Sequence, residues 1–252
     1  MKKIIHLSDT HVGYEDLVTK FGDIVTRIIF TKNPADNYVV VVTGDIVDDA
    51  TRKGSYHEAS AHLNRLKDAG FFVLVVPGNH DYGTGNLGHS KYINLFKKHF
   101  YGKATISYPK LDIIDTIAFI GLDSMAEEVH WYDRLFAEGE LGKKQLKSLA
   151  EILQSDEVKN SRYRVVYLHH HPFHPRLFYQ LKDSDDLRKT LEGHSIDALL
   201  FGHNHDGRVW NGGWGIKRVY DGGTSTGKEG KPNPHRVIDL SKEPVFDYDA
   251  QF

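Results

Sequence analysis

Short polar clusters of Asp, Asn and His recur at five points along this 252-residue chain. They are Asp9-Thr10-His11, Gly44-Asp45, Gly78-Asn79-His80-Asp81, His169-His170-His171-Pro172 and Gly202-His203-Asn204-His205. Each cluster follows a run of apolar residues that is typical of a buried strand. Because ligand sites of α/β sheets form at the carboxyl ends of strands, we expect the five loops to meet in one place.

The residue types in these clusters favour a metal site. The chain has 16 His and no Cys, and imidazole combined with carboxylate and amide oxygen suits Mn, Fe, Zn or Co. The loops offer more ligands than one tetrahedral ion needs, so we expect two ions with one carboxylate, Asp45, bridging them. Two ions about 3.5–4 Å apart hold the attacking and leaving oxygens in phosphate ester hydrolysis, and they lower the pKa of a bound water towards ~7. The glycines before Asp45, Asn79 and His203 are expected to let the backbone turn sharply.

Each cluster alone also has a purely structural explanation. Asp-x-His can be a strand-end turn capped by the Asp, and Asn-His-Asp can be a simple turn, because Asn and Asp favour turns. Gly-His-x-His can be a solvated loop. The five clusters together, each after a buried strand, favour the metal site over these explanations.

Strand and helix patterns alternate along the chain. Buried strands are predicted at 3–7, 38–43, 71–76, 165–168 and 198–201, and shorter ones at 105–108, 111–114 and 116–122. Helices are predicted at 17–29, 55–69, 90–100, 142–153 and 187–192, the second opening with a capping box from Ser55 to Glu58. Four hairpin strands are expected at 208–211, 216–220, 236–239 and 245–248. This order predicts an α/β fold of two mixed sheets, packed as a sandwich and flanked by helices, in a single domain spanning 1–252.

The composition excludes several classes of protein. Lys plus Arg number 32 and Asp plus Glu 34, a net charge of −2, which argues against stable duplex DNA binding through a broad basic face. No run reaches the ~20 apolar residues of a membrane span, so we expect no membrane partner. The first six residues have no apolar stretch of a secretory signal. With no Cys to form disulfides, these features are consistent with a cytoplasmic location.

The order of the motifs, D-x-H, G-D, G-N-H-D, H-x-x-P and G-H-x-H, resembles the calcineurin-like metallophosphoesterase superfamily, and the resemblance extends from Asp9 to the segment at 235–238. It implies a two-sheet sandwich that binds two divalent or trivalent ions, such as Mn, Fe or Zn. One ion would be held by Asp9, His11, Asp45 and His205. The other would be held by Asp45, Asn79, His169 and His203. Among the three consecutive histidines, His169 is the implied ligand and His170 the alternative.

The resemblance also implies two residues that act beside the ions. His80 would be a general acid, or a hydrogen-bond donor to the phosphate, and Asp81 would orient His80 from behind. A metal-bridging hydroxide would attack the phosphorus directly. Specificity would come from loops over the site, of which 125–138 and 173–184 are candidates that could instead pack on neighbouring helices. Lys228 and Lys231 could meet an anionic substrate, although a solvated hairpin tip is the favoured interpretation.

Within the superfamily, three features look like the class III cyclic-nucleotide and glycerophosphodiester phosphodiesterases: Ser8-Asp9-Thr10-His11, Leu122-Asp123-Ser124 and Gly139-Glu140-Leu141. We therefore expect a phosphodiesterase for a small substrate. A phosphomonoesterase or protein phosphatase is the alternative. Ser8 to Tyr14 also resembles the nuclease subunit of a double-strand-break repair complex, and an inactive binding scaffold is the least favoured possibility, since no motif is lost.

Overall fold

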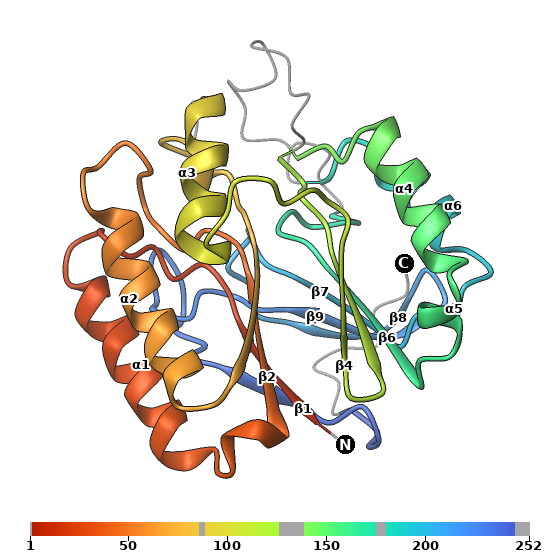
Figure 1. The fold of residues 1–252 in the computed structure, drawn as a ribbon, viewed down its shortest axis with the longest axis horizontal. Helices are drawn as coiled ribbons and strands as arrows, with labels where there is room; N and C mark the ends of the chain where they lie inside the picture. Colours follow the sequence, from red (N-terminus) through yellow and green to blue (C-terminus); the bar gives the residue numbers. More distant parts are fainter. Residues whose placement is uncertain (1, 86–88, 126–138, 175–179, 245–252) are drawn as a thin grey trace.

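Two β-sheets form the centre of the computed structural model, which describes residues 2–85, 89–125, 139–174 and 180–244 (Figure 1). The first sheet has four strands in the order β10–β1–β2–β3. These are β1 (Lys3–Leu7), β2 (Tyr38–Thr43), β3 (Phe72–Val76) and β10 (Arg236–Ile238). Strands β1, β2 and β3 are parallel, and β10 is antiparallel to β1.

The second sheet has six strands in the order β4–β5–β6–β7–β9–β8. They are β4 (Lys110–Ile114), β5 (Ile117–Gly121), β6 (Tyr163–Tyr167), β7 (Ala198–Phe201), β8 (Val209–Gly213) and β9 (Ile216–Asp221). The four central strands are parallel, and the two edge strands, β4 and β8, are antiparallel to their neighbours. Both sheets are therefore mixed.

Helices cover the outer face of each sheet (Figure 1). α1 (Leu17–Thr31), α2 (Ser55–Asp68) and α3 (Ser90–Tyr101) lie on the side of the four-stranded sheet. α4 (Lys143–Leu153), α5 (Asp156–Lys159) and α6 (Ser184–Leu191) lie on the side of the six-stranded sheet. Two short 3₁₀ helices, Ala35–Asn37 and His80–Tyr82, complete the helical elements of the described residues.

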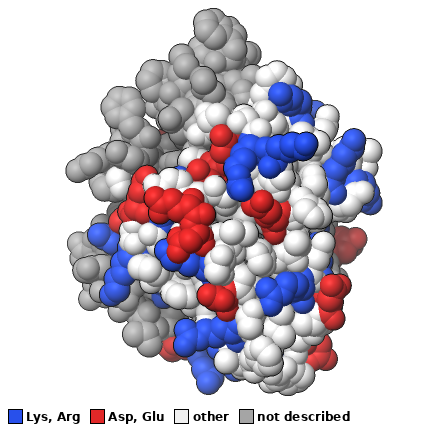
Figure 2. Space-filling model, turned by 90° about the vertical axis from the view of Figure 1, so that its left-hand side faces the viewer, with Lys and Arg blue, Asp and Glu red and all other residues white. Residues whose placement is uncertain are grey.

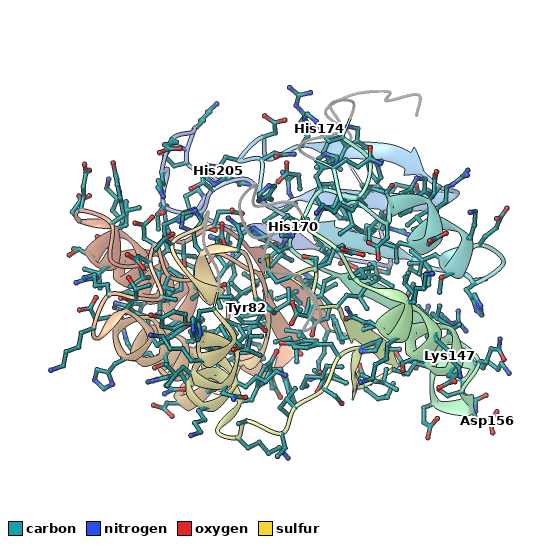
Figure 3. The ribbon with its side chains drawn as sticks, turned by 90° about the horizontal axis from the view of Figure 1, so that it is seen from above. Tyr82, Lys147, Asp156, His170, His174 and His205 are labelled. Carbon is teal, nitrogen blue, oxygen red and sulfur yellow. The ribbon has the colours of Figure 1, made fainter. Side chains whose placement is uncertain are left out.

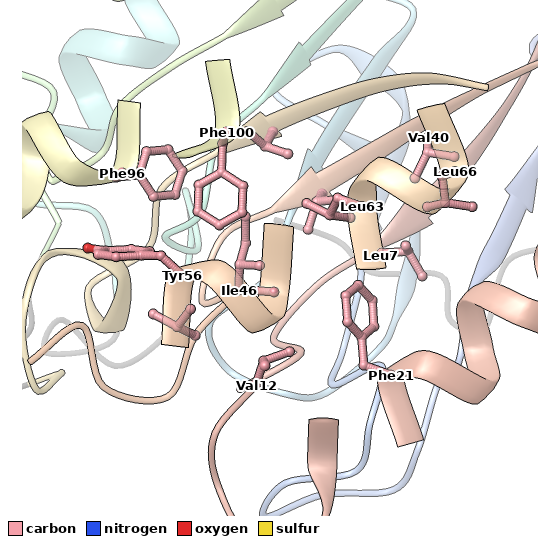
Figure 4. Close-up of a cluster of buried hydrophobic side chains, with 14 of the residues drawn as sticks. Leu7, Val12, Phe21, Val40, Ile46, Tyr56, Leu63, Leu66, Phe96 and Phe100 are labelled. Carbon is pink, nitrogen blue, oxygen red and sulfur yellow. The ribbon is translucent and has the colours of Figure 1, made fainter. Parts of the chain in front are cut away.

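The side chains of β2 show why the sequence forms four layers. Val39 and Val41 belong to the apolar cluster between the two sheets, whereas Val40 and Val42 belong to the cluster under the helices. Successive side chains of a strand point to opposite faces, so a strand buried on both faces must be apolar throughout. Figure 4 shows the outer cluster, where Val40 lies among side chains such as Leu66 and Phe21 from α2 and α1. The packing on both faces holds the parallel strands in place, and their carboxyl ends lie at one end of the sandwich.

The predicted fold class is confirmed, with local corrections. The predicted strand at 105–108 is wrong, because this segment has no strand pairing and leads into Pro109, which has no N–H to donate. The predicted capping box is wrong too: Gly54 is the N-cap of α2, Ser55 donates to the carbonyls of Asp49 and Arg52, and Glu58 pairs with Arg52. The predicted strand at 245–248 lies outside the described residues. Among the helices described, none is long and apolar enough to cross a membrane.

Candidate metal centre

The structure brings all seven predicted ligands together at the carboxyl ends of the parallel strands. The four-stranded sheet supplies Asp9, His11, Asp45 and Asn79 from the loops after β1, β2 and β3. The six-stranded sheet supplies His169, His203 and His205 from the loops after β6 and β7. Figure 3 shows His170 near the middle of the view, His205 above and to its left, and Lys147 and Asp156 at the opposite edge. The site thus lies where the two sheets meet.

One half of the site gathers around Asp9. The Oδ1 atom of Asp9 lies 3.2 Å from Nε2 of His205, and the two Nε2 atoms of His205 and His11 are 3.4 Å apart. Nε2 of His11 also lies 4.0 Å from Oδ2 of Asp45. These four residues are the set implied for the first ion.

The other half gathers around His169. Its Nε2 atom lies 3.3 Å from Oδ2 of Asp45, 3.1 Å from Oδ1 of Asn79 and 3.2 Å from Nδ1 of His203. The same Asp45 oxygen therefore faces ligands of both halves, as a bridging carboxylate must. These contacts place the four residues implied for the second ion around one point.

The nitrogen and oxygen atoms of this site are arranged to bind a cation, because they do not satisfy one another. Imidazole nitrogens face each other in both halves, and carboxylate oxygens, which have only lone pairs to offer, point at the same places. Nothing but positive charge between them satisfies all these atoms at once. Nitrogen and oxygen donors without a thiolate suit Mn, Fe or Zn, so the residues present fit two such ions.

Hydrogen bonds from behind orient the ligands. Nδ1 of His169 donates to the carbonyl of Thr43 at 2.8 Å, which leaves Nε2 for an ion. The Asn79 amide donates to the carbonyl of Gly85 at 3.1 Å, so that Oδ1 faces inward. Oδ1 of Asp45 accepts from the amide of His80 at 2.9 Å.

The geometry favours His169 over its two neighbours as the ligand. Nδ1 of His170 lies 2.8 Å from Oγ of Ser124, although its ring is within reach of His169 and His203. His171 turns away, and its ring packs against Phe201 and Trp210 in the core of the second sheet.

Charges in the site are strongly coupled. Burial and the neighbouring His169 charge lower the pKa of His203 to about 3. Burial acts in the same direction on His169, but the Asp45 carboxylate outweighs it and raises the pKa of His169 to about 9.

Most of the ligands have an unusual backbone. Positive φ angles occur at Asp9, His11, Asp45, His203 and His205, between 43° and 76°. This conformation costs of order 1–3 kcal/mol in non-glycine residues and persists where the surrounding structure enforces it. It turns the chain immediately at the strand end, so that each side chain faces the site.

The glycines before the ligands have two different roles. Gly44 has a φ of +87°, in agreement with the predicted sharp turn. Gly78 and Gly202 are not in that region, and the turn prediction is wrong for them. A Cβ atom on Gly78 would lie 2.2 Å from Oδ1 of Asp45, and one on Gly202 would lie 1.9 Å from Oγ of Ser8. These two positions need glycine because another part of the chain approaches closely.

His80 lies beside the predicted ligands, with its ring 4.8 Å from that of His11, centroid to centroid. Its Nδ1 atom pairs with the backbone carbonyl of Asp48. The predicted role of Asp81 is therefore wrong: its carboxylate accepts from the amides of Ile46, Val47 and Gly78, at 2.9–3.2 Å, instead of holding His80. Asp81 joins the loop of the bridging ligand to the loop of Asn79.

Two charged residues in contact with the site were missed or underrated by the sequence interpretation. Asp48, three residues after Asp45, lies 3.2 Å from Nδ1 of His11 through its Oδ1 atom. Lys228 pairs with the same oxygen and is not at a solvated tip, whereas Lys231 is exposed. No spacing rule links positions 48 and 228, so nothing in the sequence indicated that the two residues would pair. The one weak signal for Asp48 was its position shortly after the G-D motif.

Of the two loops proposed to control specificity, 125–138 lies almost entirely outside the described residues, and 173–184 is described except for 175–179. Of the second loop, Phe173 is buried against Phe201 and Trp210. This contact corresponds to the packing alternative for that residue.

Comparisons with known proteins identify the family of the chain. The sequence profile described as calcineurin-like phosphoesterase matches residues 2–207. A probable cyclic nucleotide phosphodiesterase of Fibrobacter succinogenes is 25% identical over 213 residues, covering 81% of this chain and 72% of the relative. The DNA double-strand break repair protein Mre11 of Haloferax volcanii is 30% identical over 131 residues, which are 49% of this chain and 28% of that protein. An uncharacterized metallophosphoesterase of Helicobacter pylori is 26% identical over 82% of this chain and 45% of its own length.

The chain thus spans less than half the length of the first two of the curated relatives compared, Mre11 and the Helicobacter protein. Among solved structures, GAP50 of Plasmodium superposes with a TM-score of 0.62 at 12% identity, over 92% of this chain and 74% of that one. The sulfate thiohydrolase SoxB of Thermus thermophilus superposes with a TM-score of 0.55 at 14% identity, over 94% and 56% of the two chains. At these identities the structures show the shared fold alone. By its profile match, its two-sheet fold and its converging motifs, the chain belongs to the calcineurin-like phosphoesterase family.

Proposed function

We propose that this protein is a dinuclear metal-dependent phosphodiesterase that hydrolyses a small phosphodiester, of the cyclic nucleotide or glycerophosphodiester type. The observation that carries the proposal is the convergence of seven nitrogen and oxygen ligands with Asp45 facing both halves. When bound, two ions would supply an activated water and neutralise the phosphate oxygens.

The chain's own residues supply the rest of the reaction. His80 is half-buried beside the ligand set, and its Nδ1–H donates to the Asp48 carbonyl, which fixes the ring. The Nε2 atom of His80 is then the one available to protonate a leaving alkoxide, a contribution of typically 10²–10⁴-fold. Asp45, Asn79 and His169 would hold the ions against which the phosphate binds.

Charge favours a diester over a monoester. A phosphomonoester carries close to two negative charges at neutral pH, whereas a diester carries one. Among the described residues at the site, Lys228 is already paired with Asp48, and its ammonium lies 3.5 Å from Nδ1 of His11, so it offers no separate cation for the second negative charge of a monoester. The similarity to the Fibrobacter relative, named a probable cyclic nucleotide phosphodiesterase, supports the same choice.

A substrate panel tests the proposal. The protein, loaded separately with Mn²⁺, Zn²⁺ or Fe²⁺, is assayed with bis-p-nitrophenyl phosphate, p-nitrophenyl phosphate, cyclic nucleotides and glycerophosphocholine. We expect kcat/KM for the diester to exceed that for the monoester by at least ~10-fold, about 1.4 kcal/mol. A preference for the monoester would make the protein a phosphomonoesterase, and bound ions without hydrolysis would indicate a scaffold.

A DNA nuclease is the second candidate, because of the similarity to Mre11 over 131 residues. On the face of the molecule at the left of Figure 1, Figure 2 shows basic and acidic side chains interspersed. Duplex binding depends on neutralising many phosphates with Lys and Arg. Degradation of linear duplex DNA at physiological salt, at a rate comparable to that of the small diester, would favour the nuclease.

A further inference from the structure

An ion pair formed by Lys228 and Asp48 lies directly behind the candidate ligand His11. The Lys228 side chain is 9% exposed and the Asp48 side chain 21%, although both belong to loops. Nζ of Lys228 donates to Oδ1 of Asp48, and Nδ1 of His11 lies 3.2 Å from the same oxygen. Lysine, aspartate and histidine therefore form one continuous chain of contacts that ends at the site.

The fold holds Lys228 in this place through the segment before it. Hydroxyl groups of Thr224 and Thr226 donate to the carbonyls of Asp9 and Thr10, each at 3.1 Å. These hydroxyls bind the segment to the first ligand loop along its length. The position of Lys228 is thus fixed by hydrogen bonds to the same loop that carries Asp9 and His11.

Asp48 is fixed from two sides through its backbone. Its amide donates to the carbonyl of Val12 at 3.1 Å, and its carbonyl pairs with Nδ1 of His80. The carboxylate faces His11 while the carbonyl faces His80. One residue therefore contacts both a candidate ligand and the candidate general acid.

These contacts determine which nitrogen of His11 is available to an ion. Nδ1 of His11 lies 3.2 Å from Oδ1 of Asp48, which can only accept, so a proton on Nδ1 leaves the lone pair on Nε2, which faces His205 and Asp45. Lys228 restrains the carboxylate in this position by pairing with the same oxygen.

We propose that Lys228 and Asp48 are a pair of positioning residues that fix His11 for the ion shared with Asp9 and His205. The proposal rests on the proposed function of the site as a dinuclear metal centre. It predicts that the pair acts through metal affinity, and that Lys228 does not contact the substrate. Residues in this position behind a metal-binding imidazole typically contribute 10–100-fold to metal affinity.

Metal binding by the apoprotein tests the proposal without reference to catalysis. Mn²⁺ is titrated calorimetrically into chelator-treated protein, and Co²⁺ absorption reports the geometry of the loaded site. We expect Asp48→Ala to weaken the binding of one of the two ions ~10–100-fold and to change the Co²⁺ spectrum. Lys228→Met should weaken the same ion ~10-fold, and Lys228→Arg, which keeps the charge, should restore most of the loss.

Neighbouring substitutions serve as matched controls. Lys231→Met removes an exposed lysine of the same loop. Asp49→Asn changes the next carboxylate along the chain, which accepts a hydrogen bond from the amide of Thr51 and is not part of the contacts to His11. Both should bind two ions as the unaltered protein does. Circular dichroism of each apoprotein checks the fold, and Asp48→Asn serves as a milder variant if Asp48→Ala does not fold.

A double-mutant cycle separates the two metal sites. The losses from Asp48→Ala and Lys228→Met should be less than additive, because both break one contact chain. The double variant Asp48→Ala/His169→Ala should bind both ions more weakly, because the two substitutions act on different metal sites. Unchanged affinity for both ions in Asp48→Ala and Lys228→Met would overturn the proposal, as would a raised KM with unaltered metal binding in Lys228→Met. Two bound ions but no hydrolysis in the unaltered protein would remove the proposed function and leave this inference standing.

Discussion

The two sheets contribute different chemistry to the same site. Every oxygen ligand, from Asp9, Asp45 and Asn79, follows a strand of the four-stranded sheet, and the six-stranded sheet supplies imidazoles alone. The two sets meet across a junction that is bridged by His203, whose amide donates to Asp9 at 3.1 Å, and by His169, whose Nδ1 donates to Thr43. One sheet thus supplies the negative charge and the other supplies neutral donors, and a cation completes both.

Asp45 gives the strongest test of this division, because its carboxylate faces ligands from both sheets. Asp45→Asn should remove most of both bound ions and reduce turnover below roughly a thousandth, beyond the 10²–10³ contributed by a single transition-state contact. Elemental analysis of the purified variant, together with the diester assay, measures both effects. Two tightly bound ions in the variant would show that Asp45 is not the bridge.

His169 tests the imidazole side, where we expect the loss of one ion. His169→Ala should weaken one ion by more than the ~100-fold expected for an outer contact. His170→Ala serves as the control, since its ring contacts Ser124, and it should retain both ions. Comparable metal loss in His170→Ala alone would assign the ligand role to position 170.

His80 should separate chemistry from metal binding, with no ion lost. His80→Ala is expected to lower turnover 10²–10⁴-fold with an alkoxide leaving group, and much less with p-nitrophenolate, which needs little protonation. The measurement is kcat for both substrates at saturating metal. Equal losses would mean that His80 positions the phosphate without donating a proton.

The six-stranded sheet also buries a carboxylate that is not among the proposed ligands, Asp221 at the end of β9. Burial raises its pKa to about 7, with the nearby Asp9 adding to the effect and the amide of Gly223 opposing it. Its Oδ2 atom has no hydrogen-bond partner among the described residues. Because the folded state binds this proton more tightly than the unfolded chain, stability should fall as pH rises from about 4 to 7.

Asp221→Asn should remove that pH-dependent cost. The variant is expected to exceed the unaltered protein in free energy of unfolding by about 1–3 kcal/mol at pH 8, and by less at pH 5, with activity preserved. Urea denaturation at the two pH values measures the difference. Equal or lower stability of the variant at pH 8 would contradict this prediction.

The sequence could predict the features that follow from local patterns, but not those that depend on contacts between distant loops. The candidate ligands follow directly from strand ends, so a local pattern was enough to predict the seven residues that the structure brings together, and also the two-sheet fold. The partners of Asp81 and the ion pair of Asp48 with Lys228 depend on how distant loops meet, and no local pattern encodes that. The failed strand at 105–108 had the residue types of a strand but no neighbour with which to pair.

The close approach at Gly202 has a consequence for how variation in this chain should be interpreted. The space for its side chain is taken by Ser8, 194 positions away, at the junction where the two sheets touch. In a library of all single substitutions, we therefore expect positions 78 and 202 to tolerate as little change as the metal ligands themselves. Their intolerance would report the fit between the two halves of the molecule, although neither residue has a side chain that could take part in the reaction.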